Sequence, residues 1–140
     1  VIEFKWTNGI WSSNEDENSK DFSNVDKVID MVKAYGLFEK AIFITFMKYL
    51  TIHLRKTYPT MQLQQLSPQP MDDYLEDIAK LNVDVDILYT LCTKEFVEKC
   101  HSLGIKVNIW TLNDKSLLQK YLDMGVDFIT SDFISPKTID

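Results

Sequence analysis

Residues 104–132, GIKVNIWTLNDKSLLQKYLDMGVDFITSD, decide the fold, because they read as a strand, a turn, a helix and a second strand. The two strands are expected at 106–110 and 127–131. In a parallel βα architecture, the carboxyl end of the sheet is where sites are built. The stretch therefore predicts a fold class and also the face that carries chemistry. Polar residues follow both strands at that end: Thr111, Asn113, Ser131 and Asp132.

The same alternation of strand and helix runs back through the chain. Further strands, apolar or alternating in pattern, are expected at 1–6, 41–46, 61–66 and 84–89. Helices with apolar residues at helical spacing are expected at 24–35, 47–57, 71–81, 94–103 and 113–125. Expected helix caps are Ser23 or Asn24, Thr93, and Asn113 or Asp114. Residues 7–23 lack a pattern and read as a long polar loop.

Six strands separated by five helices predict a parallel sheet with helical crossovers. Two architectures compete, a doubly wound open sheet and a (β/α)8 barrel. No glycine-rich phosphate loop follows any strand, which weakens the doubly wound nucleotide-binding alternative. A barrel needs eight strands, and a deficit of two agrees with a chain that opens within a strand, VIEFKW, without an initiator Met. We therefore expect a piece of a longer polypeptide, in which an incomplete (β/α)8 TIM barrel still competes with the doubly wound sheet.

Composition narrows the class of partner. The chain has 140 residues, of which 45% are hydrophobic and 26% charged, as in ordinary globular domains. A net charge of −6 argues against nucleic-acid binding, and the absence of a long apolar run argues against a membrane span. Cys92 and Cys100 fit no zinc spacing and are expected to be semi-buried thiols around one helix.

The charged pair Glu3 and Lys5 is the main candidate for chemistry. The two residues are two apart, so on a strand they point to the same face, toward the barrel interior. A charged pair there is costly unless it is solvated, paired or bound to a ligand. Spacing does not favour either of two alternatives. Glu3 is a metal ligand beside Lys5, a cation that holds an anionic substrate, or the two form a mutual salt bridge on a solvated edge strand.

Other polar and aromatic residues at the strand ends have structural alternatives. Trp110 is an apolar wall of a pocket or a core residue, Asn113 is expected to cap the next helix, and Asp132 favours a cap over a metal ligand. The two histidines, His53 and His101, fall on helices and are expected at the surface. The chain alone therefore shows no obvious general base.

Several motifs resemble one family. VNIWTLN at 107–113, followed by a helix and by GVDFITSD at 125–132, resembles the C-terminal signature of glycerophosphodiester phosphodiesterases, and 93–104 resembles the helix before it. Ile2-Glu3-Phe4-Lys5 resembles the family's Glu-x-Lys strand. Ile44-Thr45-Phe46 resembles its Ser-Ser-Phe strand end, with Ile and Thr in place of the two serines.

The resemblance implies a (β/α)8 barrel in which residues 1–140 are the C-terminal portion of a single domain, about strands three to eight. It implies that Glu3 is a metal-binding carboxylate and that Lys5 contacts the substrate. Phe46 and Trp110 are implied as apolar walls of the site. The family's catalytic histidines, its arginine and two metal ligands belong to motifs that precede the matched part.

The implied function is metal-dependent hydrolysis of glycerophosphodiesters to glycerol 3-phosphate and an alcohol by the intact protein, a step of lipid and glycerol metabolism. The implied cofactor is Ca²⁺ or Mg²⁺, hard cations that prefer oxygen ligands. The 140-residue chain by itself is expected to be inactive. Alternatives are a non-catalytic phosphodiester-binding homologue and, less favoured, a different barrel enzyme. Open sheet edges are expected to pair with another chain, to be covered by further residues, or to aggregate.

Overall fold

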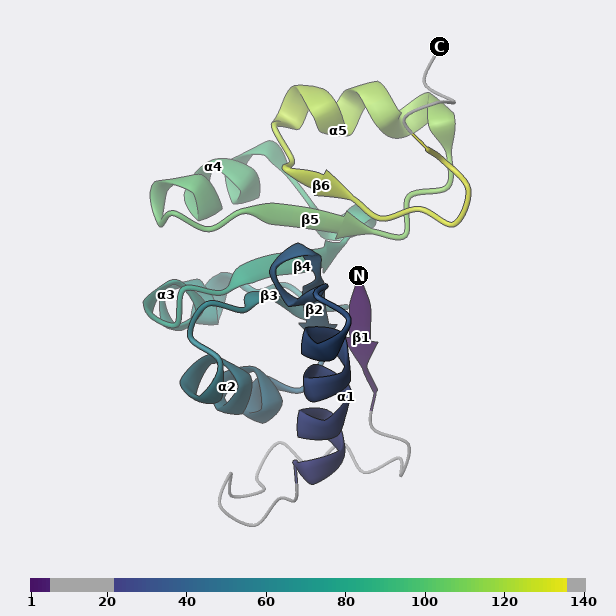
Figure 1. Cartoon of the computed structure of the whole chain (residues 1–140). Coiled ribbons are helices and arrows are strands. Elements are labelled where there is room, and N and C mark those ends of the chain that lie inside the picture. The colour runs from purple at the N-terminus through teal and green to yellow at the C-terminus, as the bar shows by residue number, and fades with distance from the viewer. Residues whose placement is uncertain (6–21, 136–140) are drawn as a thin grey trace. The chain divides into compact units, whose positions relative to one another are not determined.

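The computed structural model describes residues 1–5 and 22–135, which form two compact units, Val1–Gln65 and Leu66–Asp140 (Figure 1). Trp6, at the end of the first expected strand, and residues 7–21 of the expected loop lie outside the described residues. In the part of the chain that the structure describes, no helix is long and apolar enough to cross a membrane.

The first unit is built from parallel strands joined by helices. Its strands are β1 (Ile2–Phe4), β2 (Ile42–Thr45) and β3 (Gln62–Ser67), whose last two residues belong to the second unit. Its helices are α1 (Ser23–Ala34), the short 3-10 turn η2 (Phe38–Lys40) and α2 (Lys48–Thr57). β2 lies between β1 and β3 and pairs in parallel with both. The predicted strand–helix alternation is thus confirmed here.

The second unit continues the same pattern. Its strands β4 (Asp84–Leu88), β5 (Val107–Trp110) and β6 (Phe128–Ile129) are parallel, with β5 in the middle. Its α-helices are α3 (Leu75–Lys80), α4 (Lys94–Ser102) and α5 (Leu118–Met124). Three 3-10 turns that the pattern did not separate from helix or strand are η3 (Asp72–Tyr74), η4 (Tyr89–Leu91) and η5 (Lys115–Leu117).

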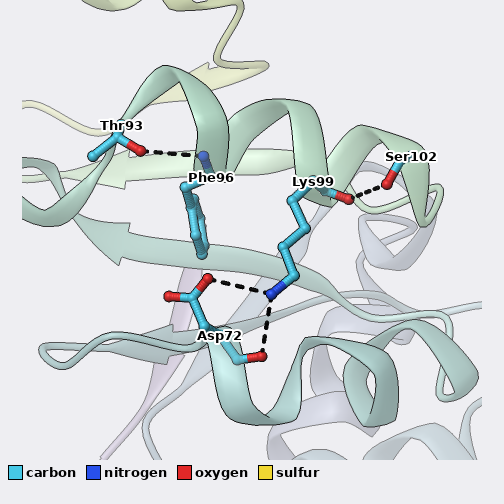
Figure 2. A network of polar contacts seen from close by, with 5 residues as sticks. All are labelled: Asp72, Thr93, Phe96, Lys99 and Ser102. Carbon is cyan, nitrogen blue, oxygen red and sulfur yellow. Dashed lines mark hydrogen bonds and ion pairs between the residues drawn. The ribbon is translucent and has the colours of Figure 1, made fainter.

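Helix α4 begins where the sequence predicts. The Phe96 amide donates to Thr93 Oγ1 at 3.2 Å, which satisfies one of the amides that a helix start leaves unpaired (Figure 2). Farther along α4, Lys99 Nζ lies 3.4 Å from Asp72 Oδ1 in η3. Both side chains of that ion pair are about half exposed, so it contributes little to stability. The Thr93 cap is the stronger determinant of this element.

Helix α1 begins differently from the prediction, because neither Ser23 nor Asn24 caps it. Phe22 occupies the N-cap position and makes no side-chain cap hydrogen bond. Phe22 is buried, and its ring stacks on His53 with 3.9 Å between centroids. Apolar packing between α1 and α2, rather than a local cap, therefore sets this start. The prediction that His53 lies at the surface was also wrong, because this packing leaves its side chain only 23% exposed.

Both units have well-packed apolar centres. In the first unit, Phe43 of β2 and Leu54 of α2 have no exposed surface, and the Phe43 ring stacks on that of Phe4 at 5.9 Å. In the second unit, Val85, Val107 and Ile109 of β4 and β5 are fully buried. Burying an aliphatic or aromatic side chain of this size contributes about 1.5–3 kcal/mol. Within each unit, this centre holds that unit's own strand ends in place.

Candidate functional site

Glu3 and Lys5 form the predicted charged pair at the carboxyl end of β1. Glu3 Oε2 lies 3.2 Å from Lys5 Nζ, with the lysine side chain 72% exposed and the glutamate 26% exposed. The other oxygen, Oε1, is buried and has no hydrogen-bond partner within residues 1–5 and 22–135. A buried oxygen left without a donor is destabilising. The salt bridge therefore pairs one of the two carboxylate oxygens and leaves the other without a donor among the described residues.

The Glu3 oxygen suits a hard divalent cation, because Ca²⁺ and Mg²⁺ take carboxylate oxygens as ligands. Only one such ligand comes from this place in the chain. Among the residues that the structure describes, no group of three or more His, Cys, Asp or Glu side chains could hold a metal ion. The donor type thus fits the expected cation, and further ligands would come from outside the described residues.

The strand register separates the two faces of the first unit. Glu3 is level with Ile44 and Gln64, while Phe4 is level with Thr45, which in turn is level with Gln65. Neighbours along a strand point to opposite faces. Glu3 therefore shares a face with Ile44 and Gln64, and Thr45 and Gln65 lie on the opposite face.

Phe46 and Trp110 both follow the predicted placement at strand ends. Phe46 comes directly after β2 in the first unit and is half-buried. Trp110 is the last residue of β5 in the second unit, and its Nε1 donates to the Asp86 carbonyl at 3.0 Å. That bond holds the indole against the neighbouring strand β4. A role for either ring as a wall of a substrate site stays a prediction.

The geometry can now be set beside known proteins. The family model described as the glycerophosphoryl diester phosphodiesterase family matches residues 2–135. This chain belongs to that family. The match includes β1 with Glu3 and Lys5 as well as the stretch 104–132 from which the fold was first read, so the predicted resemblance is confirmed.

Solved structures support the same assignment for the fold. A glycerophosphodiester phosphodiesterase from Parabacteroides distasonis is 24% identical with a TM-score of 0.70, over 86% of this chain and 50% of its own. A phosphodiesterase from Oleispira antarctica, solved in complex with the product sn-glycerol-3-phosphate, is 22% identical with a TM-score of 0.62, over 70% of this chain and 39% of its own. No curated protein matches the chain.

These likenesses confirm the predicted fold class, an incomplete (β/α)8 barrel with parallel strands. The chain spans about half the length of the Parabacteroides structure. The prediction that residues 1–140 are part of a single domain stays a prediction. So does the expectation that open sheet edges self-associate.

Two buried polar residues of this family member were missed as site candidates. Asp86 of β4 has no exposed surface and Asn108 of β5 is 3% exposed, and the two are level in the β4–β5 register. Asn108 Oδ1 accepts a hydrogen bond from Thr130 Oγ1 at 3.3 Å. The alternation in DVDIL and VNIW already placed them opposite the apolar residues of their strands. The alternation could therefore have identified Asp86 and Asn108 as candidates, and the structure adds that both side chains are buried.

Of the two expected positions for the helix start, Asp114 is confirmed, and the prediction that Asn113 caps the helix was wrong. Asp114 occupies the N-cap, and its Oδ1 accepts from the Ser116 amide at 2.9 Å. Asn113 instead joins the two strand ends: its Nδ2 donates to Asp132 Oδ2 at 2.7 Å, and its Oδ1 accepts from the Asp132 amide at 3.0 Å. The loops after β5 and β6 are thereby tied together, and Asp132 has a structural role.

The histidines lie away from the strand ends. His101, near the end of α4, is 42% exposed as predicted, and its Nε2 lies 2.9 Å from Asp127 Oδ2. His53 lies within α2, packed on Phe22. Neither belongs to a strand terminus. Among the described residues, β1 thus carries the Lys5 ammonium and the Glu3 carboxylate, and neither histidine lies on a strand.

Proposed function

We propose that the intact protein hydrolyses glycerophosphodiesters to glycerol 3-phosphate and an alcohol with the help of Ca²⁺ or Mg²⁺. The observation that carries this proposal is Glu3, whose buried Oε1 lacks a partner in the described residues while Lys5 holds its other oxygen. Family membership over residues 2–135 supports it. So does the Oleispira relative, whose structure contains sn-glycerol-3-phosphate as product.

In this proposal Glu3 contributes one ligand to the cation. The bound cation would neutralise charge on the phosphodiester as bond breaking proceeds. Lys5 offsets the same charge, since its ammonium is exposed and reaches solvent on a flexible stem. Electrostatic stabilisation of this kind is usually the largest part of catalysis in phosphoryl chemistry. Water adds across the phosphorus–oxygen bond, with its oxygen joining phosphorus and a proton leaving with the alcohol.

Phe46 and Trp110, each at a strand end of its own unit, are proposed as apolar contacts of the substrate. The acid and base that move protons are proposed to lie outside the described residues, since His53 and His101 sit on helices. For that reason we propose that the 140-residue chain alone does not turn over substrate. The same residues would bind a phosphodiester without hydrolysing it if those groups were missing.

A coupled assay for glycerol 3-phosphate tests the proposed function. The intact protein, with its sequence confirmed by mass, is incubated with glycerophosphocholine or glycerophosphoethanolamine and either Mg²⁺ or Ca²⁺. We expect turnover that stops on addition of EDTA and returns with excess metal. Absence of turnover with every metal would contradict hydrolysis, and tight substrate binding in the same samples would then favour the non-catalytic alternative.

A further inference from the structure

We infer that Thr45 is a positioning residue, which holds the end of β1 so that Glu3 and Lys5 are presented in a fixed geometry. The inference rests on the proposed function for the role of Glu3 and Lys5. It assigns a task to a residue that has no contact with substrate in that proposal. It is carried by a buried chain of hydrogen bonds that links α2, β3, β2 and β1 within the first unit.

The hydroxyl of Thr45 is bonded on both sides. Thr45 has no exposed surface, and its Oγ1 donates to the Phe4 carbonyl at 3.1 Å. The same oxygen accepts from the Met47 amide at 3.2 Å. Phe4 stands between Glu3 and Lys5, so the bonded carbonyl belongs to the peptide unit that leads from Phe4 into Lys5. One side chain thus fixes the end of β1 and the turn that carries Phe46.

Thr45 is itself held from the other direction. Gln65 Nε2 donates to the Thr45 carbonyl at 3.1 Å, and Thr51 Oγ1 donates to Gln65 Oε1 at 2.8 Å. Gln65 and Thr51 are 3% and 1% exposed. A buried polar network whose members are satisfied is rigid, because each broken bond would leave a group desolvated without a partner. The Thr45 carbonyl is therefore anchored to β3 and α2, while the Thr45 hydroxyl is the member of the network that reaches β1.

The need for such a support follows from the size of β1. The strand has three residues, and Phe4 with Thr45 is its last register pair with β2. Phe4 is its only buried side chain, since Ile2 and Glu3 are both partly exposed. A binding group must be held within about 0.5 Å of its productive position, by residues whose own positions are locked. Thr45 supplies that lock from the face opposite to Glu3.

Thr45→Val and Thr51→Val are a matched pair of substitutions, each isosteric and each in the network. Only Thr45 contacts β1, whereas Thr51 contacts Gln65 and the Met47 carbonyl. In the intact protein we expect Thr45→Val to weaken activation by metal about tenfold, the size typical of lost supporting contacts at a metal site. Thr51→Val should lower the unfolding midpoint about as much as Thr45→Val does, but it should leave the metal dependence unchanged. Thr45→Ser keeps the hydroxyl and should therefore keep the activation by metal that the unmodified protein shows.

Amide hydrogen exchange supplies a readout that does not depend on turnover. Thr45→Val should accelerate exchange of the β1 amides and of Met47, and Thr51→Val should leave the β1 amides as they are. If Thr45→Val fails to fold, Thr45→Ala takes its place. Equal effects of the Thr45 and Thr51 variants on both readouts, or unchanged β1 exchange, would overturn the inference. If the unmodified protein shows no turnover, the proposed function fails and the exchange result alone decides the role of Thr45.

Discussion

At the scale of single residues, Glu3 and Thr45 show what a sequence pattern can and cannot say. Alternation placed Glu3 and Lys5 on one face, and the 3.2 Å ion pair agrees with it. The pattern could not show that one carboxylate oxygen is buried without a partner, because that depends on the packing of the whole strand end. Ile44 and Thr45 stand where the similar family motif has two serines, and this difference alone predicts no polar role for either residue. The Thr45 hydroxyl nevertheless bridges β1 and the turn after β2.

The two cysteines are predicted to be unreactive in the folded chain. Burial raises the pKa of the Cys92 thiol to about 11 and that of Cys100 to about 12. Because the thiolate is the reactive form, and very little of either cysteine is a thiolate at pH 8, both should react slowly. We expect Ellman's reagent to modify neither thiol of the native chain at pH 8. In about 8 M urea, which should unfold the chain, it should modify both. Rapid modification of native Cys100 would contradict the described packing.

Tyr58 is predicted to link the stability of the first unit to alkaline pH. Burial, and then donation to Asp26 Oδ1 at 2.7 Å, raise its pKa from 10.0 to about 12. Because the pKa of Tyr58 is raised in the folded state, its contribution to folding stability is complete below pH 10. That contribution is lost as the pH rises through about 12.

Tyr58→Phe removes that hydrogen bond and should lower the free energy of unfolding by about 1 kcal/mol at pH 8. The difference from the unmodified chain, measured by urea unfolding, should shrink as the pH rises above 10, where Tyr58 begins to ionise on unfolding. Tyr35→Phe is the control, because Tyr35 is 76% exposed. A difference that stays constant from pH 8 to pH 12 would count against the Tyr58–Asp26 bond.

At the scale of elements, the sequence predicted helix boundaries wherever a local interaction sets them. Thr93 caps α4, and Gly125 follows α5 with φ of +86°, a left-handed conformation that favours glycine. The start of α1 was missed because Phe22 packs on His53, a residue 31 positions away by their numbers. The role of Asn113 was missed for the same reason, since its partner Asp132 belongs to another strand end.

The Thr93 cap offers a direct test at this scale. Thr93→Ala leaves the Phe96 amide without its acceptor and should lower the free energy of unfolding by about 1 kcal/mol. Thr93→Ser keeps the hydroxyl and should lose much less. Circular dichroism during urea unfolding measures both. If the alanine and serine variants were equally stable, the Thr93 hydroxyl could not be the group that starts α4.

At the scale of the whole molecule, the alternation of strands and helices was sufficient to predict a parallel sheet with helical crossovers. The motifs predicted the family and, through it, the barrel. Both rest on patterns that recur along the chain, and residues 2–135 match the family as a whole. The site was predictable only in part, because the burial of polar residues such as Gln65, Asp86 and Asn108 depends on contacts between distant parts of the chain. The groups proposed to move protons belong to no described strand end.

The central claim, that Glu3 is a metal ligand of a glycerophosphodiester phosphodiesterase, is tested most directly by Glu3→Gln. The matched control is Glu98→Gln, since Glu98 also pairs with a lysine but is 66% exposed on α4. The measurement is kcat/KM for glycerol 3-phosphate release by the intact protein as Mg²⁺ is titrated. We predict a loss of about 10²-fold or more for Glu3→Gln, with a higher metal requirement, and no change beyond about twofold for Glu98→Gln. Full activity of Glu3→Gln at the same metal concentration would contradict the claim.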